Sequence, residues 1–351
     1  MKRKSILPGI ILLTSAILIA LLVVSSSFYI YWSAAPPSRT CNSCHEINSS
    51  YNTWTASAHR DIKCSECHGT ALSNGFHSII EKARMVQTHF KEEYVEELRL
   101  SEEQVLESME SCIRCHQDNW SDWLAGGHSA TYQAIFLNTA QNSSEQINFD
   151  CLRCHGMFFD GSIEDLVEPL NITGPWLLKD PGKNDQPVIP CMACHQMHSP
   201  GNPAVRQDYA FPDLMEYNRP SKVSPLSLYS RPEKMYFHIS VLPQPDIFYD
   251  EKTILVSADP LQKLCMQCHA PGAYHQSGSA DDRTPRGVHE GFSCQSCHRP
   301  HINDTKSSCR LCHPVLSNCG LDVEKMNTSF ADPGSANNIH FVSCADCHKT
   351  N

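Results

Sequence analysis

The stretch Cys41-Asn-Ser-Cys44-His45 carries the pattern around which the chain is organised, Cys-x-x-Cys-His. Nine copies occur in the 351 residues, here numbered motif 1 to motif 9, and they begin at Cys41, Cys64, Cys112, Cys151, Cys191, Cys265, Cys294, Cys309 and Cys344. Two cysteines at this spacing can each add a thiol across a vinyl group of a haem, and the adjacent histidine then falls under the ring to ligate iron. Each copy therefore predicts one covalently attached c-type haem.

A single copy would also suit a zinc knuckle, a thioredoxin-like dithiol or part of a disulfide framework. Nine complete copies favour haem, because motif matches by chance do not recur in this way. The predicted attachment cysteines are Cys41, Cys44, Cys64, Cys67, Cys112, Cys115, Cys151, Cys154, Cys191, Cys194, Cys265, Cys268, Cys294, Cys297, Cys309, Cys312, Cys344 and Cys347. The predicted proximal ligands are His45, His68, His116, His155, His195, His269, His298, His313 and His348.

The composition limits what else the chain can be. Of its 19 cysteines only Cys319 lies outside the motifs, which leaves no pairs for a disulfide framework. We interpret Cys319 as a small buried apolar side chain rather than a redox thiol or an extra ligand. Nine haems in the roughly 315 residues after the N-terminal segment leave about 35 residues for each, too few to build a conventional core around every ring, so the haems are expected to form the core. The net charge of -10 argues against a nucleic-acid partner and favours basic or redox proteins.

The N-terminal segment has the composition of a membrane anchor. A basic cluster, Met1-Lys-Arg-Lys4, is followed by no charged residue until Arg39. The apolar run from Ile6 to Trp32 is long enough to cross a bilayer once, and aromatic residues near its end suit the far interface. A cleaved signal peptide is the alternative, but its apolar region would be shorter. We therefore predict an anchor over residues 1–35, with the basic end in the cytoplasm and the haem region on the periplasmic side of the inner membrane.

The segments after this anchor follow a recognisable order, which is Cys41-Asn-Ser-Cys44-His45-Glu46, Ser57-Ala-His59, Cys64-Ser-Glu-Cys67-His68 and a charged helix leading to Cys112-Ile-Arg-Cys115-His116. Over about residues 1–155 the chain resembles the NapC/NirT family of membrane-anchored quinol dehydrogenases. The resemblance implies a quinol site beside the first haem, with menaquinol as a candidate substrate. In that family a methionine two residues after the first motif histidine can ligate the first haem, and Ile47 stands there in this chain.

The resemblance also suggests which residues serve the quinol. Family members place a lysine and an acidic residue near the first haem, in the segment after the second motif. Lys82 lies at a comparable position, and His89 is the nearest other polar candidate. The alternatives are that Lys82 belongs to a solvated helix face and that His89 is an axial haem ligand. The same segment, from His77 to Met109, has the apolar periodicity of an amphipathic helix with a break near Ser101.

Ten histidines lie outside the motifs, namely His59, His77, His89, His128, His198, His238, His275, His289, His301 and His340. This number nearly matches the nine irons, each of which needs a sixth ligand if it only carries electrons. Some of the ten lie shortly before a motif, as His289 does, and others three residues after one, as His301 does. In multihaem cytochromes such histidines ligate a neighbouring haem, and we predict that role here.

The expected fold is mainly α-helical and irregular, with one N-terminal transmembrane helix and little or no sheet. We expect four regions: the anchor at 1–35, four haems at 36–160, a fifth haem and an extended Pro-rich belt at 161–260, and four haems at 261–351. The expected function is to carry electrons from the quinol pool to periplasmic or extracellular redox proteins. Two alternatives are a multihaem reductase of a nitrogen or sulfur oxyanion, which needs an open iron face, and a structural wire without its own quinol site.

Overall fold

The computed structural model describes residues 7–68, 84, 87–91, 100–144, 146–201, 226–249, 251–269, 287–299, 301 and 312–313. The predicted site residues that lie outside these ranges are His77, Lys82, His275, Cys309, His340, Cys344, Cys347 and His348, together with the spare Cys319. The chain divides into two compact units, Met1–Leu98 and Arg99–Asn351, and each is described by itself.

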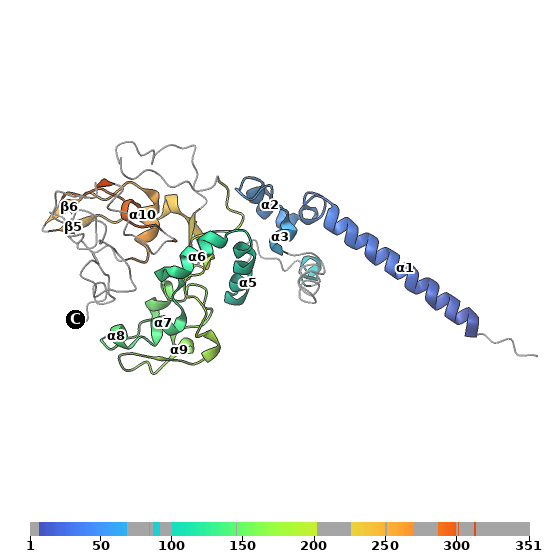
Figure 1. The fold of residues 1–351 in the computed structure, drawn as a ribbon, viewed down its shortest axis with the longest axis horizontal. Helices are drawn as coiled ribbons and strands as arrows, with labels where there is room; N and C mark the ends of the chain where they lie inside the picture. The colour runs from blue at the N-terminus through green and yellow to red at the C-terminus, as the bar shows by residue number, and fades with distance from the viewer. Residues whose placement is uncertain are drawn as a thin grey trace, which may run out of the picture. The chain divides into compact units, whose positions relative to one another are not determined.

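The first unit begins with helix α1, Leu7–Ala34, the long blue helix of Figure 1. Its segment Gly9–Ala34 has 26 residues, a mean hydropathy of 2.5 and no buried positions. At a rise of about 1.5 Å per residue this is long enough for a hydrocarbon layer of about 30 Å. The Thr14 hydroxyl donates to the Ile10 carbonyl at 3.0 Å, which satisfies a polar group on this apolar surface. The predicted spanning helix is thus confirmed as a helix of sufficient length and composition.

Short helices follow α1 and carry the first two motifs. They are η1 (Cys41–Ser43), η2 (His45–Ile47), α2 (Asn48–Thr55) and α3 (Cys64–His68). Residues 87–91 are also helical and belong to the same unit. Every described motif residue of this unit therefore lies in a helical turn or directly beside one.

The second unit opens with helix α5, Glu102–Ile113, which leads directly into motif 3. Ser101 caps it: its hydroxyl accepts from the Gln104 N–H, and the Gln104 side chain accepts from the Ser101 N–H. This capping box satisfies two backbone donors and fixes where the helix starts. The predicted helix break near Ser101 is confirmed.

Short elements continue through the unit, as Figure 1 shows in green to orange. The helices are α6 (Gln117–Ala125), η3 (Gly127–Ser129), α7 (Tyr132–Phe136), α8 (Thr139–Asn142), η4 (Phe149–Arg153), α9 (Ile163–Leu166), η5 (Pro181–Lys183), η6 (Cys191–Ala193), η8 (Ile239–Val241), α10 (Pro260–Cys265) and α11 (Cys294–Cys297). The described strands form antiparallel pairs: β1 (Val167–Glu168) with β2 (Leu177–Leu178), β3 (Ser227–Ser230) with β4 (Met235–His238), and β5 (Ile247–Tyr249) with β6 (Lys252–Ile254). The expectation of a mainly helical, irregular fold with little sheet is confirmed.

An apolar core lies around motif 4. Its buried members are Tyr132, Phe136, Leu152, Ile163, Leu166, Val167, Trp176, Leu178 and Val188. Tyr132 and Phe136 stack with ring centroids 6.3 Å apart. The expectation that the haems form the core is therefore wrong for residues 132–188, because aliphatic and aromatic side chains of this segment pack on one another.

A buried charge network ties helix α5 to this core. The Tyr132 hydroxyl donates to the Glu102 carboxylate at 2.5 Å, and Lys183 Nζ donates to the other carboxylate oxygen at 2.5 Å. The Lys183 ammonium also lies 5.3 Å from the centroid of the Phe159 ring. Burial, together with the charge of Glu102, raises the pKa of Tyr132, so this phenol stays a hydrogen-bond donor.

Phe136→Ala is expected to lower the free energy of unfolding by about 3–5 kcal/mol, because it opens a cavity among side chains that cannot collapse into it. Phe136 is 2% exposed, whereas Phe248 is 62% exposed and serves as the matched control. Phe248→Ala should change the free energy by no more than about 0.5 kcal/mol. Denaturant unfolding followed by far-UV circular dichroism measures both, and equal losses would contradict the assignment of this core.

Candidate haem-binding sites

The motifs of the second unit share one backbone turn. In motifs 3 to 7, which are the ones the structure describes in full, the histidine backbone N–H donates to the carbonyl of the first cysteine, at 2.9 Å for His116, 2.8 Å for His155, 3.1 Å for His195, 2.9 Å for His269 and 2.8 Å for His298. A bond from residue i to residue i−4 closes one turn of α-helix. The spacing Cys-x-x-Cys-His thus places two thiols and an imidazole on one short turn, which is the arrangement that attachment to one haem requires.

Motif 1 has a different turn. The Cys44 N–H donates to the Cys41 carbonyl at 3.5 Å, and the Ile47 N–H donates to the Cys44 carbonyl at 3.2 Å. These are contacts of the tighter 3₁₀ type, so His45 begins a new short helix, η2, rather than ending one.

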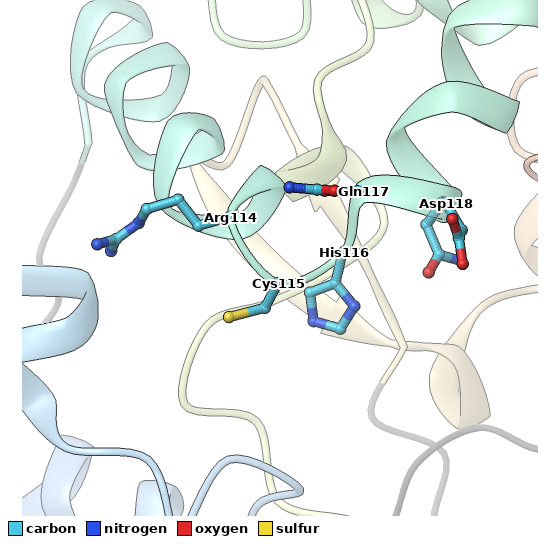
Figure 2. Close-up of a pocket in the computed structure, with 6 residues that line it drawn as sticks. Arg114, Cys115, His116, Gln117 and Asp118 are labelled. Carbon is cyan, nitrogen blue, oxygen red and sulfur yellow. The ribbon is translucent and has the colours of Figure 1, made fainter.

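Motif 3 lies beside a hollow of about 310 Å³ lined by Arg114, Cys115, His116, Gln117, Asp118 and Asn119. Figure 2 shows the Cys115 thiol and the His116 ring side by side on the turn, with the Arg114 side chain extending away from them. This volume is at the lower end of the about 300–1,000 Å³ that cofactor sites occupy. The residues present therefore fit a group held through Cys115 and ligated by His116.

Among the described residues, four motif histidines lie beside histidines from outside the motifs, with ring planes inclined by 31° to 60°. The ring centroids are 5.4 Å apart for His45 and His89, 6.0 Å for His128 and His269, 5.9 Å for His195 and His301, and 6.1 Å for His289 and His313. A metal ion binds an imidazole nitrogen at about 2.0–2.1 Å, so two rings on opposite sides of one ion have their centroids about 6 Å apart. These pairs fit haem iron with two histidine ligands.

The other described candidates are placed differently. His59 is exposed, and its backbone N–H donates to the Ser57 hydroxyl at 3.1 Å. His198 takes a positive φ of 55° in the turn after motif 5. His238 Nδ1 lies 2.7 Å from the Ser240 hydroxyl and accepts from the Ser240 N–H at 3.2 Å, which caps η8. Ligation by His59 and His198 stays a prediction.

Thiols of different motifs also approach one another. In the chain before haem attachment, burial and the neighbouring Cys41 thiol raise the pKa of Cys64 to about 11. Burial and Cys112 likewise raise the pKa of Cys191 to about 11. Motif 1 therefore adjoins motif 2 in the first unit, and motif 3 adjoins motif 5 in the second.

Motif 6 has neighbours on several sides. A hydrogen bond with Cys268 lowers the pKa of Cys154 to about 7, which places motif 4 beside motif 6. Burial, followed by the charges of Cys294 and Cys194, raises the pKa of Cys265, which places motifs 7 and 5 there as well. Haems attached at these positions would be close enough to exchange electrons along more than one route.

Comparison with known proteins agrees with this geometry. The family of cytochrome c554 and c-prime matches residues 248–299, which include motif 6 and motif 7. The cytochrome c-type protein NrfH of Wolinella succinogenes is 29% identical over 151 residues, which is 42% of this chain and 80% of that protein. The chain is a membrane-anchored multihaem c-type cytochrome. The chain resembles the NapC/NirT type of membrane-anchored multihaem cytochrome over part of its length. No solved structure matches the cytochrome.

The buried imidazole of motif 4 has the protonation state that a ligand needs. Burial lowers the pKa of His155, and its Nδ1 atom is buried without a hydrogen-bond partner. A metal-ligating histidine must be neutral, so a depressed pKa favours binding. Burial, together with the nearby His128, also lowers the pKa of His301. The imidazoles of His155 and His301 are thus neutral at neutral pH, which is the state that binds iron.

Two polar side chains beside distal histidines were missed by sequence reasoning. Glu46 accepts a hydrogen bond from His89 Nδ1, and this bond lowers the pKa of the carboxyl group. The Asn119 amide lies 3.3 Å from His301 Nδ1. Both contacts join residues far apart in the chain, so no local pattern marks them. The only sign in the sequence that Glu46 could lie near a haem ligand is that it directly follows motif 1.

Proposed function

We propose that this cytochrome accepts electrons from the quinol pool and passes them through nine haems to periplasmic or extracellular redox proteins. The observation that carries the proposal is the pairing of motif histidines with distal histidines at the spacing of two axial ligands. Two histidines close both faces of the iron and keep its geometry similar in both oxidation states, which favours electron transfer over substrate binding.

The ring pairs support specific distal ligands. We assign His89 to the haem of motif 1, His301 to motif 5, His128 to motif 6 and His289 to motif 8, from the ring distances. There are ten candidate histidines for nine irons, so one histidine has no iron to bind. We infer that this histidine is His238, because its Nδ1 already accepts from the Ser240 N–H and caps η8.

The membrane anchor supports the proposed reaction with quinol. Motif 1 begins at Cys41, a few residues after α1 ends at Ala34. A tether this short holds the first haem near the headgroups, where menaquinol in the bilayer can reach it. Quinol oxidation releases protons, and Lys82 is the candidate to accept one beside that haem, because His89 is assigned to the iron. The basic N-terminus supports a periplasmic location of the haem region, because positive charge stays on the cytoplasmic side.

We also propose a functional division of the chain beyond the two compact units. Residues 36–160 form the quinol-facing region with four haems, and 161–260 add the fifth haem and a belt. Residues 261–351 hold the remaining four haems and face the redox partner. The contacts among motifs 4, 5, 6 and 7 support a continuous route through the second unit.

The alternative functions differ in the ligation of the haem irons or in the reaction with quinol. A reductase of a nitrogen or sulfur oxyanion needs one open face beside acidic or cationic groups. A wire without a quinol site would have the same closed irons but would not be reduced by quinol. A census of low-spin and high-spin haem separates the first alternative, and reduction in liposomes separates the second.

The intact mass of the purified full-length protein is expected to exceed that of the polypeptide by nine haem masses. Cys194→Ser should keep nine haems, because the thioether of Cys191 still holds the fifth haem, and Cys191→Ser with Cys194→Ser should reduce the number of haems to eight. The control is Cys319→Ser, which lies outside every motif and should retain nine. Fewer than nine haems on the full-length wild-type chain would refute the nonahaem proposal.

A further inference from the structure

We propose that Asn119 is a positioning residue that fixes the ring of His301 as the second axial ligand of the fifth haem and tunes the reduction potential of that haem. The inference rests on the proposed ligation of the fifth haem by His195 and His301, and it deepens that proposal. The observation behind it is a contact between distant parts of the second unit, because the Asn119 amide nitrogen lies 3.3 Å from His301 Nδ1.

The contact occupies the ring nitrogen that iron does not need. The ring centroid of His301 is 5.9 Å from that of His195, and the ring planes are inclined by 31°. Two rings at this distance are spaced like ligands on opposite sides of one ion. With Nδ1 engaged by the amide, Nε2 is left for iron. Histidines that ligate metals regularly have their other ring nitrogen held by a second group, which fixes the tautomer and the ring orientation.

One side of helix α6 surrounds the His301 ring. His116, Asn119 and Asp122 are three residues apart, so they follow one side of this helix and of the turn before it. All three act on His301. Burial lowers the pKa of His301, the charges of His128 and His116 lower it further, and the charge of Asp122 opposes them. The contact with Asn119 is therefore part of a longer approach of His301 to α6.

Helix α6 is anchored well enough to position a side chain. Trp123 is 6% exposed and stacks on Trp120 with ring centroids 4.8 Å apart. The helix begins directly after His116, the proximal ligand of motif 3. Asn119 therefore links the turn that holds the third haem to the distal ligand of the fifth.

An amide suits this histidine both before and after haem attachment. It carries one acceptor oxygen and one NH2 donor, and a half-turn of its end exchanges them. In the chain without haem, His301 Nδ1 can accept from the NH2 group. With Nε2 on iron, the proton lies on Nδ1 and is donated to the amide oxygen. A carboxylate in this place could only accept, and its charge would make the imidazole a stronger electron donor that stabilises ferric iron. The neutral amide thus keeps the fifth haem easier to reduce than a carboxylate would.

The test is a potentiometric titration of the full-length, haem-loaded protein, followed by electron paramagnetic resonance. Asn119→Asp keeps the size of the side chain and adds a charge. One haem should therefore fall in potential by an amount equal to about a tenfold change in its reduced-to-oxidised ratio, which is about 59 mV for one electron. Asn119→Leu keeps the size and removes the hydrogen bond, so the same haem should rise by about a threefold change in that ratio, or roughly 30 mV. A merely structural role of Asn119 would move both variants in the same direction.

Ser121→Asp is the matched control for the added charge. Ser121 is exposed on α6, and two residues beyond Asn119 it lies on the opposite side of the helix. This variant should leave every potential nearly unchanged. A second control places Asn119→Asp in a His301→Ala protein, where it should have no more effect than Ser121→Asp, because the predicted effect acts through the ring.

Three results would overturn the inference. They are shifts of Asn119→Asp and Asn119→Leu in the same direction, an equal shift in Ser121→Asp, and a shift of Asn119→Asp that persists without the His301 ring. Failure of the proposed function would instead show in the wild type, as missing or open-faced haems.

Discussion

Deleting residues 1–35 is expected to slow reduction of the cytochrome by menaquinol in liposomes on the order of tenfold or more, because the anchor raises the effective concentration of the first haem at the bilayer surface. The anchor corresponds to α1, an exposed helix of 28 residues, and motif 1 follows it closely. Quinol stays in the bilayer, so a haem region released into solution meets it only by chance encounter. Stopped-flow absorption of the haems measures the rate.

Two controls isolate the cause of this loss. The truncated and full-length proteins should be reduced equally fast by dithionite, which needs no membrane. Within the anchored protein, Lys82→Ala should slow reduction by menaquinol, and Lys91→Ala, a nearby lysine, should not. If the truncated protein is reduced by menaquinol at the full rate, the structural-wire alternative replaces the quinol-linked one. If the Lys82→Ala protein is reduced by menaquinol at the full rate and the truncated protein is reduced slowly, the proposed quinol site is retained and the assignment of Lys82 to it is wrong.

His301→Ala is expected to convert one haem of the nine from low-spin to high-spin, because it removes the sixth ligand that lies 5.9 Å, ring to ring, from His195. An iron with one open face no longer has its geometry fixed by two histidines in both oxidation states, so electron transfer through the second unit should slow. Electron paramagnetic resonance of the ferric protein counts the converted haem. Intact mass should still show full haem attachment, because the cysteines are untouched.

The matched control is His238→Ala. His238 caps η8 through its Nδ1 atom, and we assign it no iron. This variant should lose some stability, since removing a helix cap costs about 0.5–2 kcal/mol, but it should keep every haem low-spin. A high-spin haem in His238→Ala, or none in His301→Ala, would contradict the ligand assignment.

The helical parts of this cytochrome were predictable from local pattern. The apolar run before Arg39 predicts α1, and the Ser101 to Gln104 capping box predicts where α5 begins. The motif turn follows from the five-residue spacing, because a bond from histidine to the first cysteine closes it. In each case the determining residues lie within a few positions of one another.

The ligand pairs were not predictable in the same way. His128 and His269 belong to distant segments, and so do His195 and His301. A count of histidines predicts that sixth ligands exist, whereas only tertiary packing decides which ring faces which iron. The aromatic core was missed for a related reason. An aromatic content of 8% averages over the chain and conceals how closely Tyr132, Phe136 and Trp176 are grouped.

The contact of Glu102 with Lys183 bears on how constant the rate of electron transfer between haems can be. Electron transfer between haems slows steeply as their edges separate, so small fluctuations in spacing would make each hop erratic. Glu102 begins the helix that ends in motif 3, and Lys183 precedes motif 5. Glu102 is buried and the Lys183 side chain is 20% exposed, so breaking the pair would leave a buried charge without its partner. The pair would thus hold motif 3 and motif 5, and haems attached to them, at a steady separation.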